Sequence, residues 1–170
     1  MMNVLVVDGY NIIGAWDDLQ KLKEKDMGQA RDRLIDYMAE YKAYAGDRVI
    51  VVFDAYYVQG TASKYHTHQV EIIYTKEKET ADECIERLVK SLKNVKNQVY
   101  VATSDYAEQS TIFARGALRI SARELLIELN SIDREIAKRI ENHKIMQPQS
   151  RIPLKQDVME TFEKWRRGEI

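Results

Sequence analysis

The sequence of 170 residues is poor in cysteine, proline and glycine, and each shortage excludes a class of structure. Its only cysteine, Cys84, cannot form a disulfide within the chain, so we expect a reducing cytoplasm rather than a secreted disulfide scaffold. Two prolines and seven glycines leave little material for long unstructured linkers. No apolar run approaches the ~18 residues of a membrane helix, and the apolar N-terminal run breaks at Asp8, unlike a signal peptide.

A large excess of positive charge is also missing. The net charge of −1 excludes a surface coated in lysine and arginine for binding DNA, and is compatible only with a local basic patch. Apolar residues make up 45% of the chain and charged residues 31%, which is the composition of a globular protein. The length fits one domain with an ordinary core.

Short apolar runs alternate with helical patterns along most of the chain. The runs predict strands at 3–8, 48–54, 69–75, 98–103 and 117–120. The patterns between them predict helices at 28–45, 80–93, 105–115 and 121–141. Two of these helices begin with a capping box, Thr80 with Glu83 and Ser121 with Glu124. This alternation predicts an α/β fold with a mainly parallel sheet, covered by helices on both faces.

The C-terminal segment has a different pattern. Residues 142–153 contain both prolines and little periodicity, which predicts a connector. Residues 154–167 predict a short amphipathic helix, which either packs on the same domain or binds a partner.

Acidic residues occur where the predicted strands end. Asp8 and Asp54 end the first two strands and Asp105 follows the fourth, while Asp82 lies in the first turn of a helix. In an open parallel sheet all these positions meet at one edge, where ligands bind. Each acid alone has a structural explanation as a turn, capping or dipole residue. Together they repel one another, and a cation between them relieves that repulsion.

The predicted chemistry is metal-dependent phosphodiester cleavage. No cysteine and histidine set has zinc-binding spacing, and oxygen ligands alone favour Mg²⁺ or Mn²⁺. Such ions usually act on phosphates. No phosphate-binding glycine loop or defensible nucleophile–histidine pattern is present, and Cys84 lies on the apolar face of its predicted helix.

Four segments resemble the NYN branch of the PIN-like nucleases, in particular its YacP type. They are VDGYN after the first strand, VVFDA after the second, ETADECI at a helix start and ATSDYAEQ after the fourth strand. The resemblance covers residues 1–145 and implies a three-layer domain with strand order 3-2-1-4-5. It also implies a ribosome-associated bacterial endoribonuclease that cleaves messenger RNA with Mg²⁺ or Mn²⁺. Residues 146–170 would then form a connector and a short helix, packed on the same domain.

The resemblance also implies roles for individual residues. Asp8, Asp82 and Asp105 would be catalytic and hold the metal. Asn11 would orient Asp8 or contact a phosphate, Asp54 would be a further or supporting acid, and Ser104 would support Asp105. One departure is that many PIN nucleases have another acid where this chain has Ala107. A one-metal site, or one completed by the RNA phosphate, is therefore an alternative.

Tyrosines and cations near the predicted edge are candidates for holding RNA. Residues 54–68 are predicted to form a loop beyond the second strand, and single-stranded RNA is commonly bound by stacking on aromatic rings beside cations. The candidates are Tyr56, Tyr57, Lys64, Tyr65, His66, Arg115 and Arg119, with Arg123 on the following helix. The arginines also fit a solvated helix surface, and Tyr56 also fits a core position.

Two other functions remain open from the sequence. A ribosome- or RNA-binding protein with weak catalysis is favoured by Ala107. A phosphohydrolase of small phosphate esters is disfavoured, because the chain has neither a DxDxT motif nor a phosphate-cradling loop.

Overall fold

The computed structural model describes residues 2–55, 70–94, 96–104 and 116–146, together with Arg166 and Gly168. The chain divides into two compact units, residues 1–132 and 133–170. All five strands and the two hydrophobic clusters belong to the first unit.

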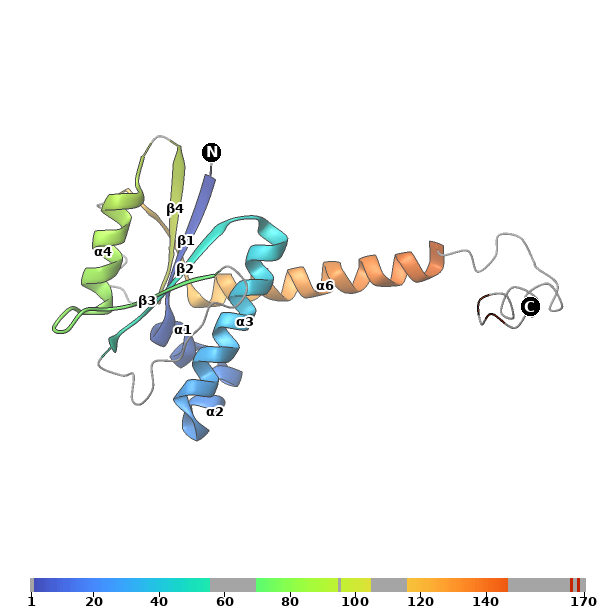
Figure 1. Ribbon diagram of the computed structural model, residues 1–170, viewed down its shortest axis with the longest axis horizontal. Coiled ribbons are helices and arrows are strands. Elements are labelled where there is room, and N and C mark those ends of the chain that lie inside the picture. The colour runs from blue at the N-terminus through green and yellow to red at the C-terminus, as the bar shows by residue number, and fades with distance from the viewer. Residues whose placement is uncertain are drawn as a thin grey trace. The chain divides into compact units, whose positions relative to one another are not determined.

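The first unit is built on a five-stranded parallel sheet in the order β3-β2-β1-β4-β5 (Figure 1). Its strands are β1 (Met2–Asp8), β2 (Arg48–Phe53), β3 (Glu71–Tyr74), β4 (Asn97–Ala102) and β5 (Leu118–Ile120). The α/β class and this strand order are therefore confirmed. Central β1 pairs with β2 on one side and β4 on the other, so its last residue, Asp8, lies in the middle of the carboxyl edge, where the strands end.

Helices connect the strands as the alternation predicts. They are α1 (Gly9–Ala15), α2 (Asp17–Lys25), α3 (Met27–Ala45), α4 (Ala81–Leu92) and α6 (Ala122–Met146). The predicted helices at 28–45, 80–93 and 121–141 correspond to α3, α4 and α6, whereas those at 105–115 and 154–167 lie outside the described residues, apart from Arg166. No helix in the described ranges combines the length and apolar character of a membrane span.

Two helices differ from the sequence prediction. Helix α1 begins directly after Asp8, and residues 17–25 form α2, and the sequence analysis predicts no helix at either place. Asp8 occupies the N-cap position of α1 but forms no side-chain capping bond, and the helix contains two glycines. The helix is instead held by Ile12 and Ile13, which are fully buried. Tertiary packing stabilises this short helix where its own propensity is weak.

The alternating side chains of the strands form two separate cores. Leu5, Val7 and Phe53 point to the face that α1, α2, α3 and the start of α6 cover. Val4 and Val6 point to the opposite face, where Cys84 and other residues of α4 pack. In Figure 1, α4 lies on one side of the sheet and α3 on the other. Asp8 continues the alternation of Val4 and Val6, which directs it to the α4 face.

Candidate active site at the carboxyl edge of the sheet

Asp8 is a nearly buried carboxylate at the end of the central strand. Its side chain is 7% exposed, and Thr103, which is fully buried, donates a long hydrogen bond from Oγ1 to Asp8 Oδ2 at 3.4 Å. Thr103 follows β4, the neighbouring strand, and its alternation with Val99 and Val101 directs it to the same face as Asp8. The two strand ends therefore present a carboxylate and a hydroxyl side by side. The sequence analysis did not identify Thr103.

Asn11 connects the start of α1 to the end of β4. Its Oδ1 accepts a hydrogen bond from the backbone N–H of Ser104 at 2.8 Å. Ser104 Oγ in turn accepts from the backbone N–H of Ala122, at the start of α6, at 3.3 Å. Asn11 and Ser104 thus fix the backbone immediately before Asp105. Asp105 itself, predicted as a metal ligand, lies outside the described residues.

The other two predicted acids come from the neighbouring connections. Asp54 directly follows β2 and is partly exposed, and the next residue, Ala55, donates its backbone N–H to Thr75 Oγ1 at 2.9 Å. Asp82 is exposed in the first turn of α4, which is capped by Thr80 Oγ1 accepting from the backbone N–H of Glu83 at 3.1 Å. The predicted capping box at Thr80 is confirmed. Because α4 follows β3, its N-terminus lies at the carboxyl edge.

A buried cation lies behind the DGYN segment, on the other face of the sheet. Arg31 of α3 is 5% exposed, and its Nη1 donates to the Tyr10 hydroxyl at 3.3 Å. Within the described part of the chain, the buried Nε of Arg31 has no hydrogen-bond partner. Tyr10 packs on Phe53 with ring centroids 5.1 Å apart, and Phe53 stacks on Tyr74 at 5.9 Å. Burial raises the pKa of the Tyr10 hydroxyl, with the Arg31 guanidinium opposing that rise.

The sequence analysis missed this arginine, because at sequence level Arg31 is one of several charges on an amphipathic helix. A buried charge is costly unless it is paired or solvated. The hydrogen bond from Arg31 to the Tyr10 hydroxyl therefore links this charge to the DGYN segment, residues 8–11.

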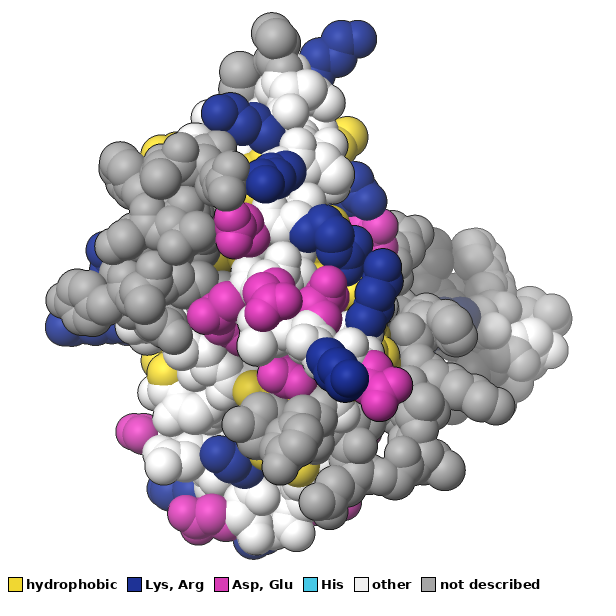
Figure 2. All heavy atoms as spheres, turned by 90° about the vertical axis from the view of Figure 1, so that its left-hand side faces the viewer, with side chains coloured by type: hydrophobic (Ala, Val, Ile, Leu, Met, Phe, Trp, Pro, Cys, Tyr) yellow, Lys and Arg dark blue, Asp and Glu magenta, His cyan; other side chains and the backbone are white. Residues whose placement is uncertain are grey.

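The chemistry of the donors fits a hard cation, although the described residues do not complete a ligand set. Figure 2 shows acidic side chains gathered on the face to which α4 and the preceding loop contribute. Asp8, Asp82 and Thr103 offer oxygen donors, which Mg²⁺ and Mn²⁺ prefer. Among the residues that the structure describes, however, no three carboxylate, histidine or cysteine side chains are grouped closely enough to hold a metal. A complete site therefore requires a further donor, and Asp105 is the residue that the sequence predicts.

Most of the predicted RNA contacts fall within 56–69 and 105–115, which the structure does not describe. Tyr56, Tyr57, Lys64, Tyr65, His66 and Arg115 lie outside the described residues. Arg119 is exposed in the middle of β5, and Arg123 is exposed in the first turn of α6. Both arginines are accessible to solvent. Their role in RNA binding stays a prediction.

Cys84 occupies the core position that the sequence predicts. Its side chain is fully buried under α4, and burial raises the pKa of the thiol. A raised pKa reduces the thiolate fraction, so this thiol is unsuited to nucleophilic catalysis.

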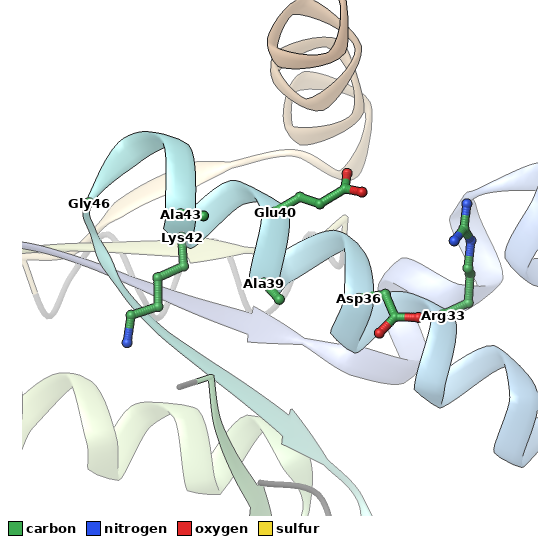
Figure 3. Close-up of a pocket in the computed structure, with 7 residues that line it drawn as sticks. All are labelled: Arg33, Asp36, Ala39, Glu40, Lys42, Ala43 and Gly46. Carbon is green, nitrogen blue, oxygen red and sulfur yellow. The ribbon is translucent and has the colours of Figure 1, made fainter. Parts of the chain in front are cut away.

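A cavity away from these acids has a mixed-charge lining. It measures about 870 Å³ and lies along the outer surface of α3 and the turn after it (Figure 3). Its described lining is Arg33, Asp36, Ala39, Glu40, Lys42, Ala43 and Gly46. Glu40 and Lys42 point in different directions, so these side chains do not converge on a common point (Figure 3).

Comparisons with known proteins agree with this fold. The model of the YacP-like NYN domain family matches residues 5–167. YacP of Bacillus subtilis is 54% identical over 169 residues, which is 99% of both chains. A crystal structure of B. subtilis Rae1 (YacP) matches with a TM-score of 0.77 and 54% identity, covering 99% of this chain and 97% of that one. A tryptophan-to-leucine mutant of Rae1 matches with a TM-score of 0.76 and 52% identity, over the same shares.

Proposed function

The chain belongs to the YacP-like NYN domain family, and from this premise we propose that it is a metal-dependent endoribonuclease. The family and the similarity to Rae1 (YacP) suggest a nuclease-type function. The substrate that we propose is messenger RNA on the translating ribosome. A net charge of −1 gives little affinity for free RNA, because phosphate neutralisation supplies most non-specific binding. A protein of this charge benefits from a platform that delivers the RNA.

The observation that carries the proposal is the meeting of Asp8 and Thr103 at the carboxyl edge. Thr103 donates to one oxygen of Asp8 and so restricts the orientation of the carboxylate. Asn11 holds the backbone N–H of Ser104, the residue that precedes Asp105 in the sequence. Buried polar side chains form contacts at this edge, and burying a polar group costs free energy unless a hydrogen bond compensates for the lost water.

In the proposed mechanism, Asp8, Asp82 and Asp105 would hold Mg²⁺ or Mn²⁺. When bound, such an ion supplies Lewis-acid stabilisation of the phosphate charge and lowers the pKa of a water. The side chains of the protein would orient the phosphodiester at this edge. Asp54, at the end of the next strand, would contribute a further charge to the same edge.

The test compares the wild-type protein with Asp82→Asn on messenger RNA, with and without translating ribosomes, in Mg²⁺ or in EDTA. We expect cleavage only by the wild type, only with the metal, and faster with ribosomes. Asp82 is exposed, so the substitution leaves the core intact, and an unchanged melting temperature checks this. Cleavage of free RNA alone would keep the nuclease and remove the ribosome from the proposal. Full activity of Asp82→Asn would remove Asp82 from the mechanism.

A second candidate is a ribosome- or RNA-binding protein with weak catalysis. It is favoured by Ala107 and by the lack of a three-ligand group among the described residues. Preserved ribosome binding without cleavage in any divalent metal would support it. Metal titration by calorimetry separates the two candidates further, since only the nuclease requires a bound ion.

A further inference from the structure

A cavity of about 480 Å³ lies at the carboxyl edge, with Asp54 in its wall. One wall is the end of β2, at Asp54 and Ala55, and the other is the connection from β3 to α4. The lining of that connection is Lys76, Glu77, Lys78, Glu79 and Thr80. Small-molecule sites usually have volumes of about 300–1,000 Å³, so one nucleotide fits this space.

The two lysines give this cavity cations that the protein itself does not pair. Within the described residues, neither Lys76 nor Lys78 forms an ion pair, and both are exposed. Glu79, in contrast, is paired with Arg87 of α4 at 3.1 Å, which neutralises one of the acids of the lining. Two ammonium groups thus remain available to an anion that enters beside Asp54.

The wall that carries the lysines has a defined shape. Lys78 has a φ of 66°, in the left-handed region that a residue with a side chain rarely adopts. The backbone N–H of Glu79 donates to the carbonyl of Lys76 at 3.0 Å, and the Glu79–Arg87 ion pair ties the loop to α4. An unfavourable backbone conformation persists where its surroundings impose it, and such positions are frequent at binding sites.

We propose that this cavity binds one nucleotide of single-stranded RNA next to the bond that is cleaved, with Lys76 and Lys78 contacting its phosphates. The inference rests on the proposed nuclease function and specifies where the substrate strand runs. The strand would pass from the acids at Asp8 and Asp82 across the end of β2. Lysine is a suitable partner here because its ammonium group binds a phosphate as a point charge on a flexible side chain.

The test removes both charges without changing the backbone. The variant is Lys76→Gln with Lys78→Asn, because asparagine tolerates a positive φ better than most residues. The matched control is Lys90→Gln with Lys96→Gln, which makes the same change in net charge at the last turn of α4 and before β4, at the opposite edge of the sheet. Each pair is made in the full-length wild type for cleavage kinetics and in full-length Asp82→Asn for binding. The probe is an end-labelled oligouridylate.

We expect the Lys76/Lys78 pair to raise KM with little change in kcat, and to weaken binding. Two lost phosphate contacts reduce the magnitude of the slope of log K against log salt by about 1.4. The loss of affinity relative to the wild type should therefore be about 25-fold larger at 0.1 M than at 1 M salt. The control pair should retain the wild-type slope. If the loop had only a structural role, the substitutions would not change the slope. If the pair lowers the melting temperature, Lys78→Gly provides a second variant, because glycine also adopts the positive φ of this position without strain.

The inference and the proposed function fail in different ways. If the wild type cleaves RNA but the two lysine pairs have equal slopes and equal KM values, the cavity is not an RNA site and the nuclease stands. If the wild type cleaves nothing in Mg²⁺ or Mn²⁺ but the slope still falls only in the Lys76/Lys78 pair, the cavity binds RNA and the catalytic proposal fails.

Discussion

Gly9, which follows Asp8, offers the sharpest test of the packing at the site. A β-carbon at this position would lie 2.3 and 2.5 Å from ring carbons of Phe53 and 3.0 Å from the carbonyl oxygen of Val52. Carbon atoms pack at about 3.5–4.0 Å, so the ring would have to retreat by more than about 1 Å. Gly9 is therefore needed for the close approach of α1 to β2.

The Phe53 ring has little room to retreat. It is fully buried between Tyr10 and Tyr74, with centroid distances of 5.1 and 5.9 Å. Overpacking of this kind costs about 1–3 kcal/mol. At about 2–4 °C per kcal/mol for a chain of this size, Gly9→Ala should lower the melting temperature by about 2–12 °C.

Gly14, in the same helix, is the matched control. It is exposed, and a β-carbon there would meet nothing within 4 Å. Gly14→Ala should therefore stabilise the protein by about 0.5–1 kcal/mol, because alanine loses less backbone entropy in a helix. The assay is thermal unfolding followed by circular dichroism, with RNA cleavage measured in parallel. Equal melting temperatures for the two variants would refute the argument from close approach.

Three further variants test other contacts of the first unit. Arg48 Nε and Glu71 Oε2 lie 2.6 Å apart, and the Arg48 guanidinium lowers the pKa of Glu71 from its ordinary value of 4.5. The pair therefore stabilises the fold above pH 4.5, and this stabilisation is lost as the pH falls through the lowered pKa. Both side chains are more than a third exposed, so Glu71→Gln should cost at most about 1 kcal/mol in urea unfolding at pH 7, and less at pH 3; a larger loss at pH 3 would contradict this sign. Trp16→Phe removes the donor of a buried 2.9 Å hydrogen bond to the Ala122 carbonyl, and a urea midpoint within error of wild type would refute the expected loss of about 1–3 kcal/mol. Thr103→Val keeps the shape but removes the hydroxyl on Asp8, so cleavage should fall about 10- to 100-fold with an unchanged melting temperature, and undiminished cleavage would exclude this positioning role.

The sequence alone contained the central strands of the sheet and the starts of two helices. Runs such as VLVV and RVIVVF predict strands buried on both faces, and those strands are β1 and β2. The capping boxes at Thr80 and Ser121 locate the starts of α4 and α6, and both serine and threonine hydroxyls accept the predicted backbone bonds. The strand order followed from the resemblance to the NYN nucleases rather than from periodicity, because pairing of parallel strands is not a local property.

The placement of charged residues in the sequence also indicates α2. Acidic residues Asp17 and Asp18 begin this helix, and Lys23 and Lys25 end it, which complements the helix dipole. For α1 the charge signal is missing, because its first turn has no acid and its last turn no base, and Asp8 at its N-cap forms no side-chain capping bond.

Only the tertiary structure decided which side chains support the candidate site. Thr103 and Asp8 are 95 positions apart, and Ser104 and Asn11 are 93 apart, so neither contact follows from local spacing. The burial of Arg31 beside Tyr10 likewise depends on how α3 packs on the sheet. Local propensity and periodicity determine the helices and strands, and with them the edge of the sheet at which the acids gather. Pairing and packing between distant segments determine which hydroxyl, amide or cation contacts the residues of that edge.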